Sequence, residues 1–252
     1  MDGMFRLDGR VAIVTGASRG LGQALAEALA RAGADVAGVA TSDLAATRLR
    51  VEAAGRRFVA LPADLRSIAV LPRIVDDTVR ELGRVDILVN NAGLIRRQDA
   101  IDFTEQDWDD VMNVNLKTVF FLSQAFARQC FLQGGGGRII NIASMLSFQG
   151  GIRVPSYTAS KSGVMGLTRL LANEWAARGI NVNAIAPGYM ATDNTAALRA
   201  DEKRSAEILA RIPAGRWGAP EDLAGAVVFL ASPASAYVHG HTLAVDGGWL
   251  AR

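Results

Sequence analysis

The chain begins with an apolar stretch, a glycine-rich turn and a helical pattern in direct succession. Residues 10–14 read R-V-A-I-V, the turn after them reads T-G-A-S-R-G-L-G, and apolar side chains recur at helical spacing over 23–31. Gly16, Gly20 and Gly22 let the backbone approach a pyrophosphate closely, and the free amide groups of a following helix can bind its oxygens. A glycine turn between a strand and a helix therefore predicts the opening of a nucleotide-binding α/β unit.

Strand-like and helix-like segments alternate through the rest of the chain. We expect strands at 35–40, 58–61, 86–89, 138–143, 180–186 and 242–245, and helices at about 43–54, 68–82, 105–132, 155–178 and 220–230. Such alternation is typical of a parallel sheet whose right-handed crossover helices cover both faces. No linker or repeat divides the chain, so we expect one α/β domain over 1–252. It would be a Rossmann-type doubly wound parallel sheet in three layers, with a mobile helical lid at about 190–215.

Composition and charge exclude several classes of protein. Hydrophobic residues make up 50% of the chain and charged residues 21%, the formal net charge is +2, and no run of basic residues indicates nucleic-acid binding. No apolar stretch is long enough to cross a membrane, and an apolar signal core is lacking. The single cysteine, Cys130, cannot form an internal disulfide, and two histidines, His239 and His241, exclude a His-rich metal site. We therefore expect a cytoplasmic, metal-free protein that binds neither nucleic acid nor membrane.

A tyrosine, a lysine and a serine form the candidate reactive group. Tyr157 and Lys161 are four residues apart, which places them on one face of a helix whose first turn suits Pro155. Ser144 follows the predicted strand 138–143 and can lie beside the tyrosine. A phenol has a pKa near 10, and a nearby ammonium lowers it, so the group is equipped to move a proton at a carbonyl or carbinol. By itself, the Tyr-x-x-x-Lys spacing is far more often that of an ordinary surface helix.

Asparagines mark two further positions. N-N-A-G at 90–93 follows the predicted strand 86–89, where it could be only a turn. Asn113 and Asn115 lie inside the predicted helix 105–132, although asparagine is unfavourable within helices. We expect a local distortion or a buried hydrogen bond at one of them.

Six short motifs stand together in the order and spacing of one family. They are T-G-x-x-x-G-x-G at 15–22, N-N-A-G at 90–93, Asn115, Ser144, Y-x-x-x-K at 157–161 and P-G with a following threonine at 187–192. Over essentially its whole length the chain resembles the short-chain dehydrogenase/reductase family. The resemblance implies that Tyr157 is the general acid and base and that Lys161 lowers its pKa and binds the nicotinamide ribose. It also implies that Ser144 holds the reacting substrate oxygen and that Asn115 anchors a water for proton relay.

The same resemblance implies a nicotinamide dinucleotide bound along the cleft. Asp64 would meet the adenine, and Pro187, Gly188 and Thr192 would hold the nicotinamide amide. The full set of implied contacts is Gly16, Ser18, Arg19, Gly20, Leu21, Gly22, Asp43, Asp64, Leu65, Asn91, Ala92, Gly93, Tyr157, Lys161, Pro187, Gly188, Met190 and Thr192.

The residues leave the choice between NAD and NADP open. NAD enzymes usually carry an acid at the end of the second strand, for the ribose 2′-hydroxyl. Here that position holds the neutral residues Ala40, Thr41 and Ser42. Asp43 comes slightly later and is equally well placed to cap the next helix, whereas Arg19 could receive a 2′-phosphate. The resemblance implies NAD, and NADP is the alternative.

Several longer runs resemble family members that act on deoxy-sugar acids in pectin and hexuronate breakdown. The runs are N-N-A-G-L-I-R-R, A-P-G-Y-M-A-T, R-I-P-A-G-R-W-G and A-V-D-G-G-W-L-A-R. A sugar acid needs a cation for its carboxylate. The candidates are Arg153 and either Arg96 or Arg97, each of which could equally be a solvated surface arginine. Met145 and Gln149 would shape the substrate pocket.

Two alternative functions and an oligomeric assembly are also compatible with the sequence. An NADPH-dependent 3-oxoacyl carrier-protein reductase would share the reactive group, and a dinucleotide-binding regulator could keep the fold without catalysis. Helices 105–132 and 155–178 are apolar on more than one face. The resemblance implies that they pair between subunits of a homotetramer.

Overall fold

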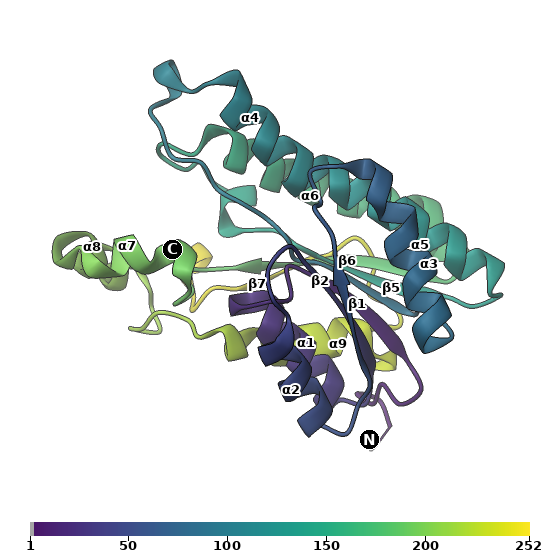
Figure 1. The fold of residues 1–252 in the computed structure, drawn as a ribbon. Helices are drawn as coiled ribbons and strands as arrows, with labels where there is room; N and C mark the ends of the chain where they lie inside the picture. The colour runs from purple at the N-terminus through teal and green to yellow at the C-terminus, as the bar shows by residue number, and fades with distance from the viewer. Residues whose placement is uncertain (1–2) are drawn as a thin grey trace.

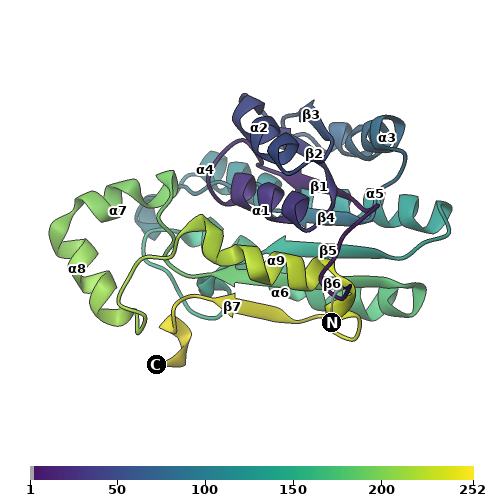
Figure 2. The ribbon, with the colours of Figure 1, turned by 90° about the horizontal axis from the view of Figure 1, so that it is seen from below.

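Seven parallel strands form one central sheet in this computed structural model, which describes residues 3–252. The strand order is β3-β2-β1-β4-β5-β6-β7, and Figure 2 shows the strands from below. The strands are β1 (Val11–Thr15), β2 (Asp35–Ala40), β3 (Phe58–Pro62), β4 (Ile87–Asn90), β5 (Gly137–Ile142), β6 (Ile180–Pro187) and β7 (Thr242–Val245). The expected doubly wound parallel sheet is confirmed.

Helices cover both faces of this sheet, as Figure 1 shows. One face carries α3 (Leu71–Leu82), α4 (Glu105–Met112), α5 (Thr118–Leu132) and α6 (Pro155–Trp175), and the other carries α1 (Gly20–Arg31), α2 (Ala45–Ala53) and α9 (Ala224–Ala231). Two further helices, α7 (Ala196–Ala200) and α8 (Glu202–Arg211), extend beyond the end of the sheet. No helix within residues 3–252 combines the length and the apolar character needed to cross a membrane.

Side chains of the strands alternate between two apolar cores. Val14 of β1 packs into the core with α1 and α9, whereas its neighbour Ile13 packs into the core with α3, α5 and α6. All five residues of β1 are buried, as are all six of β2. Strands covered on both faces bury every side chain, which is why they read as continuous apolar runs in the sequence.

The chain reverses direction across the sheet between β1 and β4. From β1 it proceeds to β2 and β3 on one side and then returns to β4 on the other. In open α/β sheets, ligands bind outside the carboxyl ends of the strands at such a switch point. The fold therefore places the turn after β1 and the N-N-A-G segment after β4 side by side.

The predicted helix 105–132 is interrupted. It is divided into α4 and α5 by a π-helical segment, Asn113–Lys117, with Asn115 fully buried inside it. Both expected explanations for a buried asparagine apply, because the backbone is distorted and the amide is hydrogen-bonded. Other boundaries shift slightly: α1 begins at Gly20, and a 3-10 turn at Ile68–Val70 precedes α3. The lid region is helical as expected, and its mobility stays a prediction.

Candidate active site

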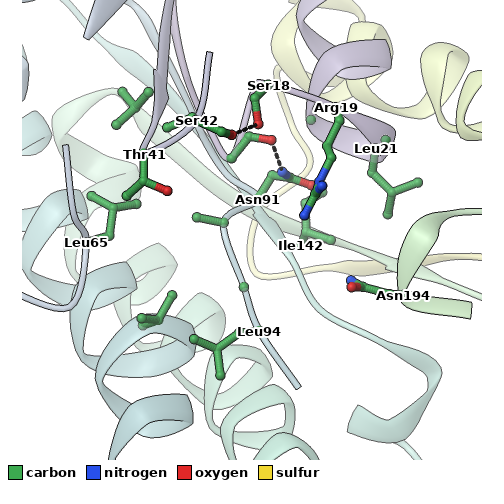
Figure 3. A pocket seen from close by; sticks show the side chains of 18 of the residues that line it. Ser18, Arg19, Leu21, Thr41, Ser42, Leu65, Asn91, Leu94, Ile142 and Asn194 are labelled. Atoms are coloured by element: carbon green, nitrogen blue, oxygen red, sulfur yellow. Dashed lines mark hydrogen bonds between the residues drawn. The ribbon is translucent and has the colours of Figure 1, made fainter. Parts of the chain in front are cut away.

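A cleft of about 430 Å³ opens at the carboxyl ends of β1 and β4. Most of the residues predicted to bind the cofactor line it (Figure 3). The predicted residues along its walls are Gly16, Ser18, Arg19, Gly20, Leu21, Gly22, Asp64, Leu65, Asn91, Ala92, Gly93, Arg96, Tyr157, Lys161 and Thr192. The tertiary structure thus brings the glycine turn, the segment after β4 and helix α6 together in one site.

The glycine turn packs too tightly for side chains. A Cβ on Gly22 would lie 2.1 Å from the carbonyl oxygen of Gly16, and Gly16 itself has φ +65°. Gly20, at the start of α1, has φ +55°, a region that glycine enters without strain. The amide Nδ2 of Asn91 donates to the carbonyl of Thr15 (2.8 Å) and holds the turn against the segment after β4. This backbone-only surface ahead of a helix fits the pyrophosphate of a dinucleotide.

Neutral hydroxyls stand at the end of β2, on the cleft wall. The hydroxyl of Ser42 donates to that of Ser18 at 2.8 Å (Figure 3), and Thr41 lies beside them. Arg19 also lines the cleft, and its guanidinium pairs with Asp193 at 3.4 Å. A hydroxyl pair and a guanidinium favour a phosphate more than they favour a bare 2′-hydroxyl.

Two predicted acidic contacts have other partners. The carboxylate of Asp43 accepts from the amide of Ala45 at 3.0 Å, and Asp43 is outside the residues that line the cleft. The bond goes to the first residue of α2, although the N-cap residue is Leu44, and the ribose contact of Asp43 stays a prediction. Asp64 does line the cleft, and its carboxylate binds the Arg66 guanidinium at 2.6 Å. That hydrogen bond holds the pKa of Asp64 below its ordinary value.

Tyr157 and Lys161 project from the first two turns of α6, which begins at Pro155. The ammonium of Lys161 is 5% exposed and donates to the carbonyl of Ile142, at the end of β5, over 2.5 Å. It lies 5.7 Å from the centre of the Tyr157 ring. Ser144 begins a 3-10 turn, and its hydroxyl accepts from the amide of Leu146 at 3.1 Å.

Burial shifts the pKa values of both Tyr157 and Lys161. Burial raises the pKa of Tyr157, whereas the Ser144 hydroxyl and the positive charge of Arg97 act to lower it. Burial also lowers the pKa of Lys161, to about 8. The ammonium is directed to the Ile142 carbonyl, and burial outweighs the groups that favour the phenolate. The role of Lys161 in lowering the pKa of the phenol stays a prediction.

Asn115 fixes the segment that follows β4. Its Oδ1 accepts from the amide of Leu94 at 2.9 Å, and its Nδ2 donates to the carbonyl of Leu94 at 2.9 Å and to the Ser160 hydroxyl at 3.3 Å. The π-helical segment positions this amide, and such segments are frequent at functional sites. The predicted water held by Asn115 stays a prediction.

The residues predicted to contact substrate are divided between two loops. Arg96 pairs with Asp107 (3.2 Å) and Asp110 (3.1 Å), and Arg153 pairs with Asp99 (3.0 Å). Both arginines therefore already neutralise carboxylates of the chain.

Met145 and Gln149 lie on the loop after Ser144. Met145 is buried in a small cluster with Ile208, Ile212 and Trp249, and Gln149 is partly buried. This cluster connects the loop to α8.

The residues expected to contact the nicotinamide are divided between the cleft and a second, smaller cavity. Thr192 lines the cleft, but Gly188 and Met190 line a smaller cavity of about 190 Å³. Pro187 is the buried last residue of β6.

Some cleft residues were not predicted as contacts. They are Val39, Ala40, Thr41, Ser42, Ala63, Arg66, Leu94, Asp110, Val114, Ile142, Asp193 and Asn194. Those at strand ends, such as Ile142, could have been found from the rule that ligands bind at the carboxyl ends of parallel strands. Asn194 comes from the lid, whose path no motif indicates.

Known proteins with the same architecture are closely similar to this chain. The family model described as enoyl-(acyl carrier protein) reductase matches residues 16–250. A 2-dehydro-3-deoxy-D-gluconate 5-dehydrogenase of Escherichia coli (strain K12) is 67% identical over 248 residues, which is 98% of each chain. A protein of Agrobacterium tumefaciens, solved with bound NADP, is 58% identical with a TM-score of 0.93, covering 98% of this chain and 99% of that one.

A second solved structure contains a small acid as well as a dinucleotide. It is a gluconate 5-dehydrogenase from Burkholderia cenocepacia J2315 in complex with NADP and tartrate. It is 40% identical with a TM-score of 0.94, covering 99% of this chain and 98% of that one. With fold, cleft and similarity in agreement, the chain belongs to the short-chain dehydrogenase/reductase family.

Proposed function

We propose that this chain is an NAD(P)-dependent oxidoreductase that interconverts a secondary alcohol and a ketone on a deoxy-sugar acid. The substrate we propose is 2-dehydro-3-deoxy-D-gluconate, as the name of the 67% identical relative indicates. One observation carries the chemistry: Tyr157 and Lys161 line the same cleft as the glycine turn. A proton-transfer group and a dinucleotide cradle in one cleft are what hydride transfer at a carbinol requires.

The chain's own residues would handle the proton of this reaction. When bound, the nicotinamide ring would take the hydride from the carbinol carbon or give it to the ketone. In oxidation, the phenol oxygen of Tyr157 would accept the hydroxyl proton as the carbinol becomes a carbonyl, and in reduction it would return that proton. Ser144 would hold the reacting oxygen, and Lys161 would bind the nicotinamide ribose. Asn115 would organise the route by which the proton reaches solvent.

The cofactor preference is a separate proposal. NAD is the cofactor implied by the sequence resemblance, and we propose that NADP is also accepted. The support is local: Ser18, Thr41 and Ser42 offer hydroxyls, Arg19 offers a positive charge, and the carboxylate of Asp43 is bound to its own helix. No carboxylate at this strand end would repel a 2′-phosphate. Bound NADP in two relatives agrees with this proposal.

Two alternative functions fit less well. A 3-oxoacyl carrier-protein reductase would use the same proton donor, but a carrier protein calls for a basic docking face and the 67% identical relative acts on a sugar acid. A non-catalytic regulator would not need Ser144, Tyr157 and Lys161 together. An enzymatic function therefore accounts for the presence of all three side chains.

Substitution of the phenol tests the mechanism directly. Tyr157→Phe keeps the ring and removes only the proton-bearing oxygen, so kcat should fall by about 10²- to 10⁴-fold. Dinucleotide affinity, measured by fluorescence titration, should stay within about twofold because most of the dinucleotide contacts proposed here lie elsewhere. Initial rates with 2-dehydro-3-deoxy-D-gluconate and both dinucleotides provide the measurement. Turnover that survives this substitution would rule out the proposed proton donor.

Assembly, domain organisation and location are also proposals. A groove of about 480 Å³ between α5 and α6 includes Phe120, Phe131 and Trp175, and Leu170 beside them is 46% exposed. This surface supports a homotetramer formed through these helices, which the mass of the protein in solution would decide. The single catalytic domain over 1–252 and the cytoplasmic location stay predictions.

A further inference from the structure

Three loops surround the substrate end of the cleft, and Arg97 stands where they meet. The loop after β4 is joined to the loop before α6, because the amide of Gln98 donates to the carbonyl of Arg153 at 3.1 Å and Asp99 pairs with the Arg153 guanidinium. On its other side, the Arg97 guanidinium donates to the carbonyl oxygen of Asn194 at 3.1 Å. Asn194 belongs to the segment that leads into α7 and lines the cleft (Figure 3).

The other candidate arginines already have charged partners. Arg96 contacts two carboxylates of α4, Asp107 and Asp110, and Arg153 contacts one on the neighbouring loop. Within residues 3–252, no carboxylate lies within ion-pair distance of Arg97. Its hydrogen bond goes to a neutral carbonyl, so its charge is available to an incoming anion.

The position of Arg97 also matches the reacting centre. Its positive charge acts on the phenol of Tyr157 in the direction of a lower pKa, although burial raises that pKa overall. Asn194, the hydrogen-bond partner of Arg97, lines the same cleft as Tyr157, so a substrate whose carboxylate met the Arg97 guanidinium would extend its carbon chain into that cleft. An ion pair with two parallel hydrogen bonds would also fix the orientation of that chain.

We propose that Arg97 binds the carboxylate of the sugar acid while remaining in contact with the lid through Asn194. This inference rests on the proposed function and assigns the substrate anchor within it. The anchor connects substrate binding to the segment before α7, because one guanidinium contacts both. Arg96 and Arg153 then serve to shape the loops and do not bind the anion.

Two substrates that differ only in the carboxylate distinguish loss of the carboxylate contact from a general loss of activity. Initial rates would be measured with 2-dehydro-3-deoxy-D-gluconate and with its methyl ester, which keeps the carbinol and lacks the charge. Arg97→Met should raise KM for the acid by roughly 10- to 100-fold and change KM for the ester by less than about threefold. Arg97→Lys keeps the charge but lacks the planar set of donors. Its KM for the acid should therefore lie between that of the wild type and that of Arg97→Met.

Arg199 provides a matched control. Its guanidinium also donates to a lid carbonyl, that of Thr192 at 3.2 Å, and it is an exposed side chain. Arg199→Met should therefore report the loss of a lid contact alone and leave KM for the acid within about threefold of the wild type. Equal effects of the Arg97 and Arg199 substitutions, or equal effects on acid and ester, would overturn the assignment of Arg97.

Turnover of the acid and the ester by the wild type tests the proposed function. If it turns over neither form of the sugar acid, the proposed function fails, whatever Arg97 does. Calorimetric titration of D-gluconate into wild type and Arg97→Met then tests Arg97 independently. Equal affinities in that titration would overturn the anchor, and an affinity lower by about tenfold in the variant would support it.

Discussion

The two walls of the cleft are held by different kinds of interaction. The wall formed by the glycine turn is backbone packed against backbone: a Cβ at Gly22 would lie 2.1 Å from an oxygen of Gly16. The opposite wall, around 192–195, is held by polar side-chain contacts such as the ion pair of Arg19 with Asp193. Those two side chains are 79% and 77% exposed.

This difference has a physical consequence. Packed backbone cannot accept even one methyl group without moving, whereas an exposed ion pair contributes about 1 kcal/mol or less because water screens it. The glycine wall should thus be rigid and intolerant of substitution. The lid wall should tolerate substitution and lose only the interaction that is removed.

The largest expected effect is on the glycine wall. Gly22→Ala would force the Gly16 carbonyl away from its position, and we expect dinucleotide affinity to fall by roughly 100-fold with a lower melting temperature. Fluorescence titration and thermal unfolding would measure both. Gly225→Ala is the control, since Gly225 is exposed in α9 with no atom within 4 Å of an added Cβ. Near-wild-type affinity in Gly22→Ala would contradict the rigid wall.

A smaller effect is expected where the two walls meet. Arg19→Ala removes the exposed pair with Asp193 and the cation at the ribose end, so thermal stability should hardly change. The ratio of kcat/KM with NADP to that with NAD should fall by about tenfold, because only NADP carries the 2′-phosphate. If both cofactors are affected equally, Arg19 contacts the shared pyrophosphate and not the 2′-phosphate.

The smallest expected effect comes from Lys161, which belongs to neither wall. Its pKa is lowered to about 8 from 10.5 by burial, so the unfolded chain binds its proton more tightly than the folded one. The free energy of unfolding should therefore rise by about 1 kcal/mol between pH 7 and pH 9 from this group. Chemical denaturation of wild type and Lys161→Met at both values measures the difference. An identical pH response in the two proteins would show that the lysine is not desolvated.

Much of the fold could be predicted because periodicity and burial are local properties. Strands 35–40 and 242–245 have the predicted bounds. A buried bond or a distortion was predicted at one of Asn113 and Asn115, and Asn115 has both. The division of helix 105–132 could not be located, because the π segment depends on how Asn115 meets Leu94 from another element. The cofactor turn was predictable since its glycines all lie within seven residues of the chain, at 16, 20 and 22.

The site was less predictable where it depends on partners distant in sequence. Arg96 and Arg153 are paired with carboxylates that no motif marks. The pKa of Tyr157 is raised by burial, and the groups that act to lower it are Ser144 and Arg97, which the sequence argument did not place beside the phenol.

The sequence by itself determined the family, the parallel sheet and the identities of the groups that carry the chemistry, since these depend on spacing along the chain. Only the tertiary structure decided which charges are neutralised and which remain available, as Arg97 and Arg96 illustrate. The physical reason is that solvation and ion pairing depend on distances in space. Two neighbouring arginines therefore have different partners, carboxylates for Arg96 and a carbonyl for Arg97.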